Sequence, residues 1–256
     1  MKRIFDVQLL LRSVYRRSKL AKRIIFFLRA PRLRRMARLK ALPFNGDRII
    51  LEAMRSLIGC GVSFFVETGT YLGHSSGYIA GEYPELKVFT IENNDNYFDA
   101  SSRVLKRYPN IRTVRGDSAE EIKKIIGSEL RDAQALFFLD AHWHDFFPLP
   151  EEIRSISAGT SKAIILIHDF QVPGRDEFGF DVYQGKAIGM DVLLDNLNKA
   201  GKYSIFLPAY DYFSAFNQCG SDPKKLRGCA IIFLNADEAC LKFRQNPVSK
   251  RFKLYK

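Results

Sequence analysis

Short runs of apolar and β-branched residues alternate with helical stretches over most of this 256-residue chain. The first five runs lack polar alternation and are separated by helices, as strands buried on both faces of a parallel sheet are. Right-handed crossovers then place helices on both sides of the sheet. The sequence predicts one α/β domain with a doubly wound, mostly parallel sheet, whose strands are Val62–Val66, Val88–Ile91, Ile111–Val114, Ala135–Leu139, Ala163–Ile167, Tyr203–Leu207 and Ala230–Leu234. The last two are joined by a long segment without an obvious helix, Pro208 to Gly228, which favours an antiparallel final strand.

Polar side chains follow each of the first five predicted strands. In an open α/β sheet, ligands bind outside the carboxyl ends of the strands. An acid at one strand end is ordinary, whereas acids at five successive ends outline a site. They are Glu67, Glu92, Asp117, Asp140 and the pair His168-Asp169.

A glycine turn follows the first predicted strand. Gly69 and Gly73 carry no Cβ, so the backbone can turn tightly there and approach a ligand. A dinucleotide fingerprint would have a further glycine where this chain has Tyr71. S-adenosylmethionine has no pyrophosphate to be cradled, and its ammonium group favours an acid such as Glu67. The turn is therefore compatible with S-adenosylmethionine as the cofactor, although two glycines after a strand can also be no more than a connection.

The next two strand ends complete the predicted cofactor site. A carboxylate at Glu92 can accept both hydroxyls of a ribose. Oxygens of Asp117 and Ser118 can reach an adenine amino group, although either residue can instead cap the helix that begins near Ala119. The residues expected to contact the cofactor are Glu67, Gly69, Tyr71, Gly73, Ser75, Glu92, Asn93, Asp117, Ser118 and Asp140.

Between residues 60 and 190 the order of these signals resembles a known family. The motifs E-T-G-T-Y-L-G-H-S, T-I-E-N-N, R-G-D-S, F-F-L-D-A-H-W and I-L-I-H-D-F look like those of class I S-adenosylmethionine-dependent methyltransferases of the catechol O-methyltransferase type. They are also similar to the metal-dependent sugar O-methyltransferases of macrolide biosynthesis. The resemblance implies a Rossmann-like methyltransferase fold with a seven-stranded sheet and a reversed last strand. Members of these families often bind a divalent metal.

Methyl transfer to a hydroxyl needs a base, a Lewis acid or both. Asp140 and the pair His168-Asp169 end neighbouring predicted strands, so they can share one ion such as Mg²⁺. In the resembling families the fourth-strand acid and a pair after the fifth strand hold metal. The catechol type has Asp-Asn where this chain has His168-Asp169, so Asp140 and Asp169 are the firmer expected ligands.

Two histidines follow Asp140 and are candidates for the catalytic base. A neutral imidazole accepts a proton near pH 7, and both His142 and His144 meet this requirement. Alternatively, His142 packs on the cofactor side and His144 faces solvent. The segment from Asp169 to Gly189 lacks a clear helix and is rich in glycine and aromatic residues, which is typical of an active-site flap.

Residues 1–44 form a basic leader with 14 Lys or Arg and one acid. Apolar residues from Ile4 to Leu28 recur at helical spacing beside a cationic face. Such a helix can bind an anionic membrane surface through residues 4–40, pack on the body or another subunit, or serve as a transit peptide. We expect residues 45–256 to form the methyltransferase domain.

The body itself is close to neutral. The whole chain carries a formal charge of +12, yet residues 45–256 carry −1, so no nucleic-acid partner is expected. Four cysteines without metal-ligand spacing favour reduced thiols and a cytoplasmic protein; a Cys219–Cys229 bridge is the alternative. No run is long enough to span a bilayer.

The predicted activity is a metal-assisted O-methyl transfer to a small molecule or glycan, by an enzyme that can form homo-oligomers. A nicotinamide-dependent oxidoreductase is the first alternative, because Glu92 would also suit its ribose. The others are a non-catalytic cofactor-binding protein of the same fold and an RNA methyltransferase.

Overall fold

The computed structural model describes residues 42–130, 133–142, 146–183, 185–197, 201–218 and 226–255, together with residues 31 and 35. Apart from those two residues and residues 42–44, the basic leader lies outside this part of the chain, and so do His144 and Cys219.

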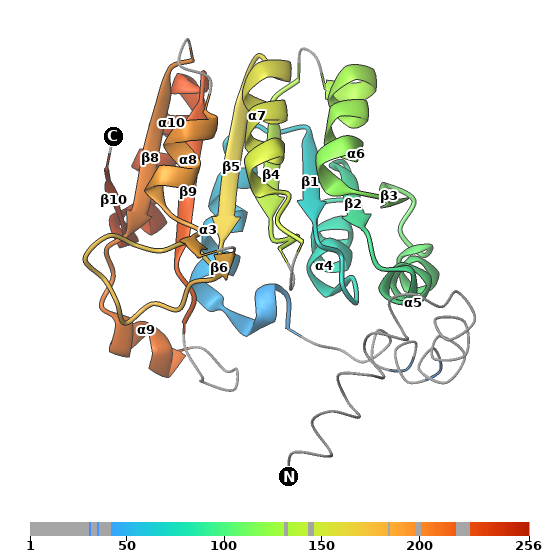
Figure 1. Ribbon diagram of the computed structural model, residues 1–256, viewed down its shortest axis with the longest axis horizontal. Helices are drawn as coiled ribbons and strands as arrows, with labels where there is room; N and C mark the ends of the chain where they lie inside the picture. Colours follow the sequence, from blue (N-terminus) through green and yellow to red (C-terminus); the bar gives the residue numbers. More distant parts are fainter. Residues whose placement is uncertain are drawn as a thin grey trace.

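Eight strands form one mixed sheet with the order β10-β8-β9-β5-β4-β1-β2-β3 (Figure 1). Strands β1 to β5 run parallel to one another, whereas β9 runs antiparallel to both β5 and β8. The mostly parallel sheet with a reversed strand is therefore confirmed. The strands are β1 (Phe64–Thr68), β2 (Lys87–Glu92), β3 (Ile111–Arg115), β4 (Ala135–Leu139), β5 (Ala163–His168), β8 (Tyr203–Pro208), β9 (Cys229–Leu234) and β10 (Phe252–Leu254).

Burial explains the apolar runs of the central strands. Every residue of β1, β4, β5 and β9 is buried, because helices cover both faces of the sheet (Figure 1). Helices α6, α7 and α8 pack beside one another, while α3 contacts α10 and joins α4 through a hydrogen bond from Arg55 to Tyr78. The helices are α3 (Arg48–Ile58), α4 (His74–Glu82), α5 (Asp95–Leu105), α6 (Ser118–Ile125), α7 (Leu149–Gly159), α8 (Met190–Asn196), α9 (Tyr212–Gln218) and α10 (Asp237–Gln245). Short helical turns occur at η1 (Phe44–Gly46), η2 (Ile126–Leu130) and η3 (Pro247–Arg251).

Side-chain caps place the starts of several helices. Asp47 accepts backbone hydrogen bonds from Ile49 and Ile50 at the start of α3, and Asn94 does the same for Asn96 and Tyr97 in α5. These caps satisfy N–H groups that have no partner within the helix.

Three segments contain more regular structure than the sequence predicts. The sheet has an eighth strand, β10, because the C-terminal residues turn back and pair with β8. The segment Pro208 to Gly228 contains α9, and the flap segment contains the hairpin strands β6 (Val182–Tyr183) and β7 (Lys186–Ala187). Of these additions, β10 depends on pairing with a distant part of the chain, which local patterns do not reveal.

The predicted domain boundary at residue 45 cuts through the core. Phe44 is buried, its ring packs edge-on against Phe138 at 5.3 Å, and its N–H donates to Ser75 Oγ at 2.9 Å. The folded body therefore includes Phe44, which the sequence assigned to the leader.

Two further predictions concern membrane-spanning segments and the cysteine thiols. None of the helices in the described ranges is long and apolar enough to cross a bilayer. Cys60, Cys229 and Cys240 are buried free thiols.

Candidate functional site

The ends of β1, β2, β4 and β5 surround a cavity of about 570 Å³. These strands are parallel and in register, so the residues at their carboxyl ends meet at one edge of the sheet. Most of the predicted site residues line this cavity: Glu67, Gly69, Tyr71, Ser75, Glu92, Asn93, Ser118, Asp140, His142, His168 and Asp169.

The glycine turn after β1 presses directly against the end of β4. Gly69 has φ +86°, and a Cβ added there would lie 2.4 Å from the backbone oxygen of Asp140. Tyr71 also has a positive φ of 49°, which is unusual for a bulky residue, and its N–H donates to Glu92 Oε2 at 2.8 Å. The turn is therefore held between two of the acidic strand ends.

Glu67 is buried at the floor of the cavity. Its Oε2 accepts hydrogen bonds from the Ser76 hydroxyl and, at 2.7 Å, from the Thr90 hydroxyl. Burial raises the pKa of Glu67 to about 8, against the opposing effect of these two hydrogen bonds. An ammonium group entering the cavity would favour the ionised form of this carboxyl.

Glu92 is fixed by the backbone around it. Its Oε2 accepts from the Tyr71 N–H, and its Oε1 accepts from the Asn94 N–H at 2.7 Å. Burial raises the pKa of Glu92, while these backbone hydrogen bonds oppose the rise. The carboxylate lines the cavity in a fixed orientation, as recognition of a ribose diol requires.

Asp117 and Gly73 have local roles outside the lining of the cavity. Asp117 Oδ1 caps α6 by accepting from the Ala119 N–H at 2.9 Å, which is the alternative role that the sequence left open for it. Gly73 precedes α4 with φ +78°, and a Cβ there would lie 2.9 Å from Leu105 Cδ1. Ser118, next to Asp117, does line the cavity.

The segment before α3 forms a wall of the cavity that the sequence did not reveal. Leu42, Phe44 and Asn45 line it, and Leu42 is also 60% exposed. Positive φ angles at Phe44 and Asn45 turn the chain across this edge of the sheet. The run Pro43-Phe44-Asn45-Gly46 is typical of a turn, but this local pattern does not show that the turn packs against the cavity.

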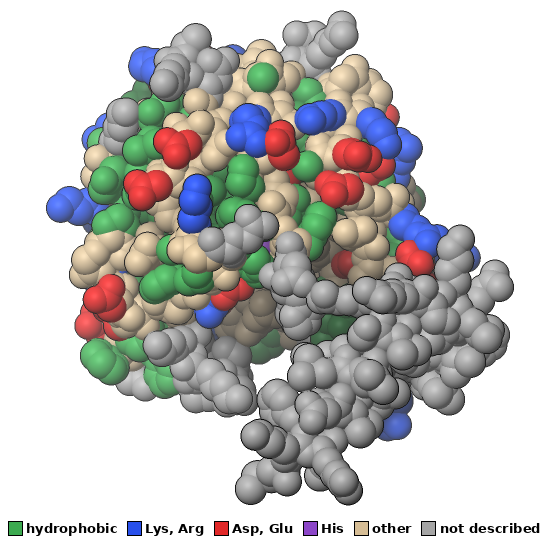
Figure 2. Space-filling view, in the orientation of Figure 1, with side chains coloured by type: hydrophobic (Ala, Val, Ile, Leu, Met, Phe, Trp, Pro, Cys, Tyr) green, Lys and Arg blue, Asp and Glu red, His purple; other side chains and the backbone are tan. Residues whose placement is uncertain are grey.

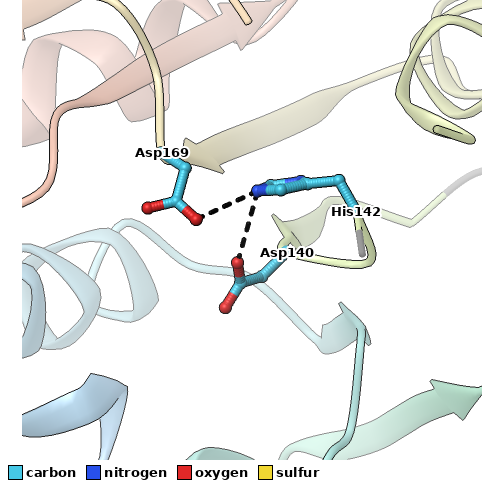
Figure 3. A group of neighbouring side chains, drawn as sticks. All are labelled: Asp140, His142 and Asp169. Carbon is cyan, nitrogen blue, oxygen red and sulfur yellow. Dashed lines mark hydrogen bonds and ion pairs between the residues drawn. The ribbon is translucent and has the colours of Figure 1, made fainter. Parts of the chain in front are cut away.

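Asp140, His142 and Asp169 also line the cavity and point toward one another (Figure 3). His142 Nε2 lies 3.1 Å from Asp169 Oδ2 and 3.7 Å from Asp140 Oδ1. Each residue offers one ligand atom, and these atoms lie within 4.8 Å of one another. This group of three, which we call the Asp-His-Asp cluster, includes His142 in place of the predicted ligand His168.

His168 lies beside the cluster and bridges its two acids. Its Nδ1 is 3.3 Å from Asp140 Oδ1 and 3.3 Å from Asp169 Oδ1. Burial alone would lower the pKa of His168, but the charges of Asp169 and Asp140 raise it well above its usual value. The pKa of His142 is likewise raised, because its bond to Asp169 and the nearby charges outweigh burial. Although burial opposes it, the pKa of Asp169 falls, chiefly because of the charge of His168.

Arg227 is a site residue that sequence reasoning missed. Its Nε donates to Asp169 Oδ1, and its second terminal nitrogen donates to Asp181 Oδ1. Arg227 precedes β9 by two residues and carries no motif, so only the antiparallel placement of β9 beside β5 brings it to this site.

Aromatic rings surround the Asp-His-Asp cluster. The Tyr183 ring stacks on Phe147 with centroids 5.0 Å apart, and it meets the His142 ring edge-on at 5.7 Å. The flap segment therefore contributes an aromatic ring that packs against His142, while its role as a flap over the acceptor stays a prediction.

Solved structures with this architecture include three O-methyltransferases. The enzyme from Bacillus cereus, in complex with S-adenosylhomocysteine, matches with a TM-score of 0.53 at 14% identity over 82% of this chain and 90% of that chain. TomG from Streptomyces achromogenes, in complex with S-adenosylmethionine, gives 0.53 at 13% over 82% and 89%. A protein from Staphylococcus aureus described as a caffeoyl-CoA O-methyltransferase gives 0.51 at 17% over 84% and 100%.

These likenesses establish the fold. The chain has the α/β Rossmann-like fold of S-adenosylmethionine-dependent O-methyltransferases, with a mostly parallel sheet and antiparallel C-terminal strands. The fold expected from the motifs is confirmed. No protein-family model and no curated protein sequence matches the chain.

Proposed function

We propose that this protein is an S-adenosylmethionine-dependent methyltransferase that methylates a hydroxyl group of a small molecule or sugar with the help of a divalent cation. The observation that carries the proposal is that Glu67 and Glu92 line the same cavity as the Asp-His-Asp cluster. A cofactor half and a chemical half thus share one space.

The residues on the cofactor side fit S-adenosylmethionine. Glu92 is an oriented carboxylate suited to a ribose diol, and Glu67 is a buried acid suited to an ammonium group. Tyr71 stands where a dinucleotide fingerprint needs glycine, so the turn offers no bare cradle for a pyrophosphate. The fold is the one found in complexes of other proteins with S-adenosylmethionine and S-adenosylhomocysteine.

The charges on the other side fit a divalent cation. Asp140, Asp169 and Asp181 contribute three carboxylates, and Arg227 contributes one guanidinium. The formal charges of these four groups sum to −2, so together they would attract a divalent cation, and His142 would bind it as a neutral ligand.

The donor set indicates which cations suit the cluster. Two carboxylates and one imidazole offer both oxygen and nitrogen, and imidazole favours metals such as iron or zinc, while carboxylates also suit Mn²⁺ and Mg²⁺. Mn²⁺ is therefore a suitable probe. A cation at this position would orient the acceptor oxygen and lower the pKa of its hydroxyl.

Methyl transfer needs little else from the protein. The acceptor oxygen forms a bond to the methyl carbon, the electron pair of the broken carbon–sulfur bond stays on sulfur, and the hydroxyl proton leaves to a base. His142 has one nitrogen facing both acids, so that nitrogen can bind a cation or accept the proton, but not both at once. We assign His142 to the cation; His144, the other candidate base, lies outside the described residues.

The surface charge favours a small acceptor over a nucleic acid. Over the described residues on the face seen in Figure 2, Lys and Arg side chains are interspersed with Asp and Glu and form no continuous basic area. A polynucleotide acceptor would need such an area to neutralise its phosphates.

Isothermal titration with S-adenosylhomocysteine and, separately, with NADH tests the proposal. We expect binding of S-adenosylhomocysteine alone. Binding of NADH alone would replace the proposal with a nicotinamide-dependent oxidoreductase. Binding of neither compound would favour a non-catalytic protein of the same fold that no longer binds a cofactor. Addition of Mn²⁺ to the same samples tests the cation independently of any acceptor.

We also propose that the basic leader binds an anionic membrane surface. Its Lys and Arg residues outnumber its acids by 13, which suits anionic headgroups. The leader joins the body at Leu42, an exposed residue at the cavity wall. The leader would therefore attach the protein to the membrane at a point of the body close to the cavity.

A further inference from the structure

The segment between β5 and α8, residues 169–189, is attached to the chain before β9 by its backbone. The Phe170 N–H donates to the Gly228 carbonyl at 2.9 Å, and Gly179 exchanges hydrogen bonds of 2.8 Å with Leu226 and Gly228. A Cβ at Gly228 would lie 2.1 Å from the Phe170 oxygen, so the two strands of chain meet too closely for any larger residue. We call residues 226–228 the docking strand.

Arg227 is the residue of the docking strand whose side chain contacts acids that line the cavity. It bonds Asp169 at the start of the attached segment and Asp181 twelve positions later. These two acids are also joined through the backbone, because the Asp181 N–H donates to the Asp169 carbonyl at 3.1 Å. One guanidinium therefore closes a loop whose two ends both carry carboxylates that line the cavity.

Both carboxylate oxygens of Asp169 have partners. Asp169 has a positive φ of 57°, a conformation that costs free energy for a residue with a side chain unless its surroundings hold it. Its Oδ1 faces Arg227, and its Oδ2 faces His142 at 3.1 Å. Only one oxygen of Asp169 thus faces the Asp-His-Asp cluster.

We propose that Arg227 is a positioning residue. By holding Asp169 and Asp181 together, it fixes the attached segment beside the Asp-His-Asp cluster. It also leaves one oxygen of Asp169, Oδ2, to bind a cation. This role rests on the proposed function only where it concerns the cation. The attachment of the segment is independent of it.

Hydrogen exchange measured by mass spectrometry tests the attachment without any ligand. In Arg227→Met, peptides covering Gln171, Asp181 and Ile188 should exchange faster, because their N–H groups bond within the attached segment. Peptides covering Gly69 and Thr70, which bond to β2, should be unchanged. In Arg227→Lys, exchange of the first set of peptides should be faster than in the wild-type protein and slower than in Arg227→Met, since one ammonium cannot reproduce the contact of a guanidinium with two acids.

A matched control removes an ion-paired arginine elsewhere. Arg103 pairs with Asp99 at 3.1 Å on the surface of α5, so Arg103→Met loses a similar contact far from the cluster. It should leave exchange in residues 169–189 unchanged. Equal exchange in Arg227→Met and the wild-type protein would overturn the proposal.

Titration with Mn²⁺, followed by electron paramagnetic resonance, separates positioning from simple charge balance. Loss of a residue that orients a ligand typically weakens metal binding about tenfold or more, and we expect this for Arg227→Met. Unchanged Mn²⁺ binding would mean that Arg227 does not orient a ligand, and tighter binding would mean that it acts only by electrostatic repulsion of the cation. Either result would show that the positioning role is wrong. Arg227→Met should keep its affinity for S-adenosylhomocysteine, because the bonds of Arg227 to Asp169 and Asp181 involve none of the cofactor-side residues. Failure of the wild-type protein to bind S-adenosylhomocysteine would count against the proposed function alone.

Discussion

The backbone N–H of Tyr71 donates a 2.8 Å hydrogen bond to the carboxylate of Glu92. This contact joins the glycine turn after β1 to the acid that ends β2. The turn and the acid therefore form one unit on the cofactor side, and the predictions for that side start from this pair.

Replacement of Glu92 should abolish cofactor binding. Glu92→Ala removes the carboxylate expected to bind a ribose diol, and hydrogen bonds to a charged group contribute about 1.5–3 kcal/mol each. Affinity for S-adenosylhomocysteine, measured by titration calorimetry, should fall by about a hundredfold or more. Asp95→Ala removes an exposed acid at the start of α5 and should leave affinity unchanged. Retained binding in Glu92→Ala would remove Glu92 from the site.

Replacement of Asp140 should separate the two halves of the site. Asp140→Asn keeps the size of the side chain and the backbone contact with Gly69 but removes a charged ligand from the Asp-His-Asp cluster. We expect affinity for S-adenosylhomocysteine within about threefold of wild type, whereas Mn²⁺ binding should fall by more than about tenfold. Normal Mn²⁺ binding would place the cation elsewhere.

Gly69→Ala should destabilise the protein through a steric clash. The new Cβ would lie 2.4 Å from the Asp140 oxygen, which is a backbone atom and cannot move aside cheaply. Gly174→Ala provides the control, because Gly174 also has a positive φ, +71°, yet nothing lies within 4 Å of its Cβ position. Thermal unfolding should show a larger loss for Gly69→Ala. Equal losses would attribute the effect to backbone strain alone.

The buried acid Glu67 should make stability depend on pH. Its folded-state pKa of about 8 exceeds the ordinary value of 4.5, so the folded protein binds this proton more tightly than the unfolded chain. The contribution is full below the unfolded pKa and is lost as pH rises towards 8. The free energy of unfolding in urea should therefore fall between pH 5 and 8, and it should fall less steeply in Glu67→Gln. Parallel profiles for the two proteins would contradict the assignment.

Liposome co-sedimentation should distinguish a membrane-binding leader from one that packs on the body. The truncated chain should begin at Leu42 rather than Asn45, because Phe44 belongs to the core. Full-length protein should pellet with vesicles containing anionic lipid and much less with neutral ones, while the truncated chain should stay in the supernatant. Equal pelleting of both chains would end the membrane proposal.

Much of the fold follows from the sequence because burial leaves a local record. Strands such as Ala135–Leu139 and Ala163–His168 are apolar over almost their whole length, since every residue in them is buried between layers of helices. Parallel strands bring their carboxyl ends to one edge. The positions of Glu67, Glu92 and Asp140 at the ends of apolar runs are therefore enough to predict that they line one cavity.

Contacts between distant residues had to come from the tertiary structure. Arg227 reaches Asp169 only because β9 runs antiparallel beside β5, and Phe44 enters the cavity wall only because the chain turns at Phe44 and Asn45. The choice of His142 rather than His168 for the Asp-His-Asp cluster likewise depends on where the two rings point in space. Strand periodicity and strand-end chemistry are local properties of a sequence. Side-chain direction and the pairing of remote segments depend on the packing of the whole chain.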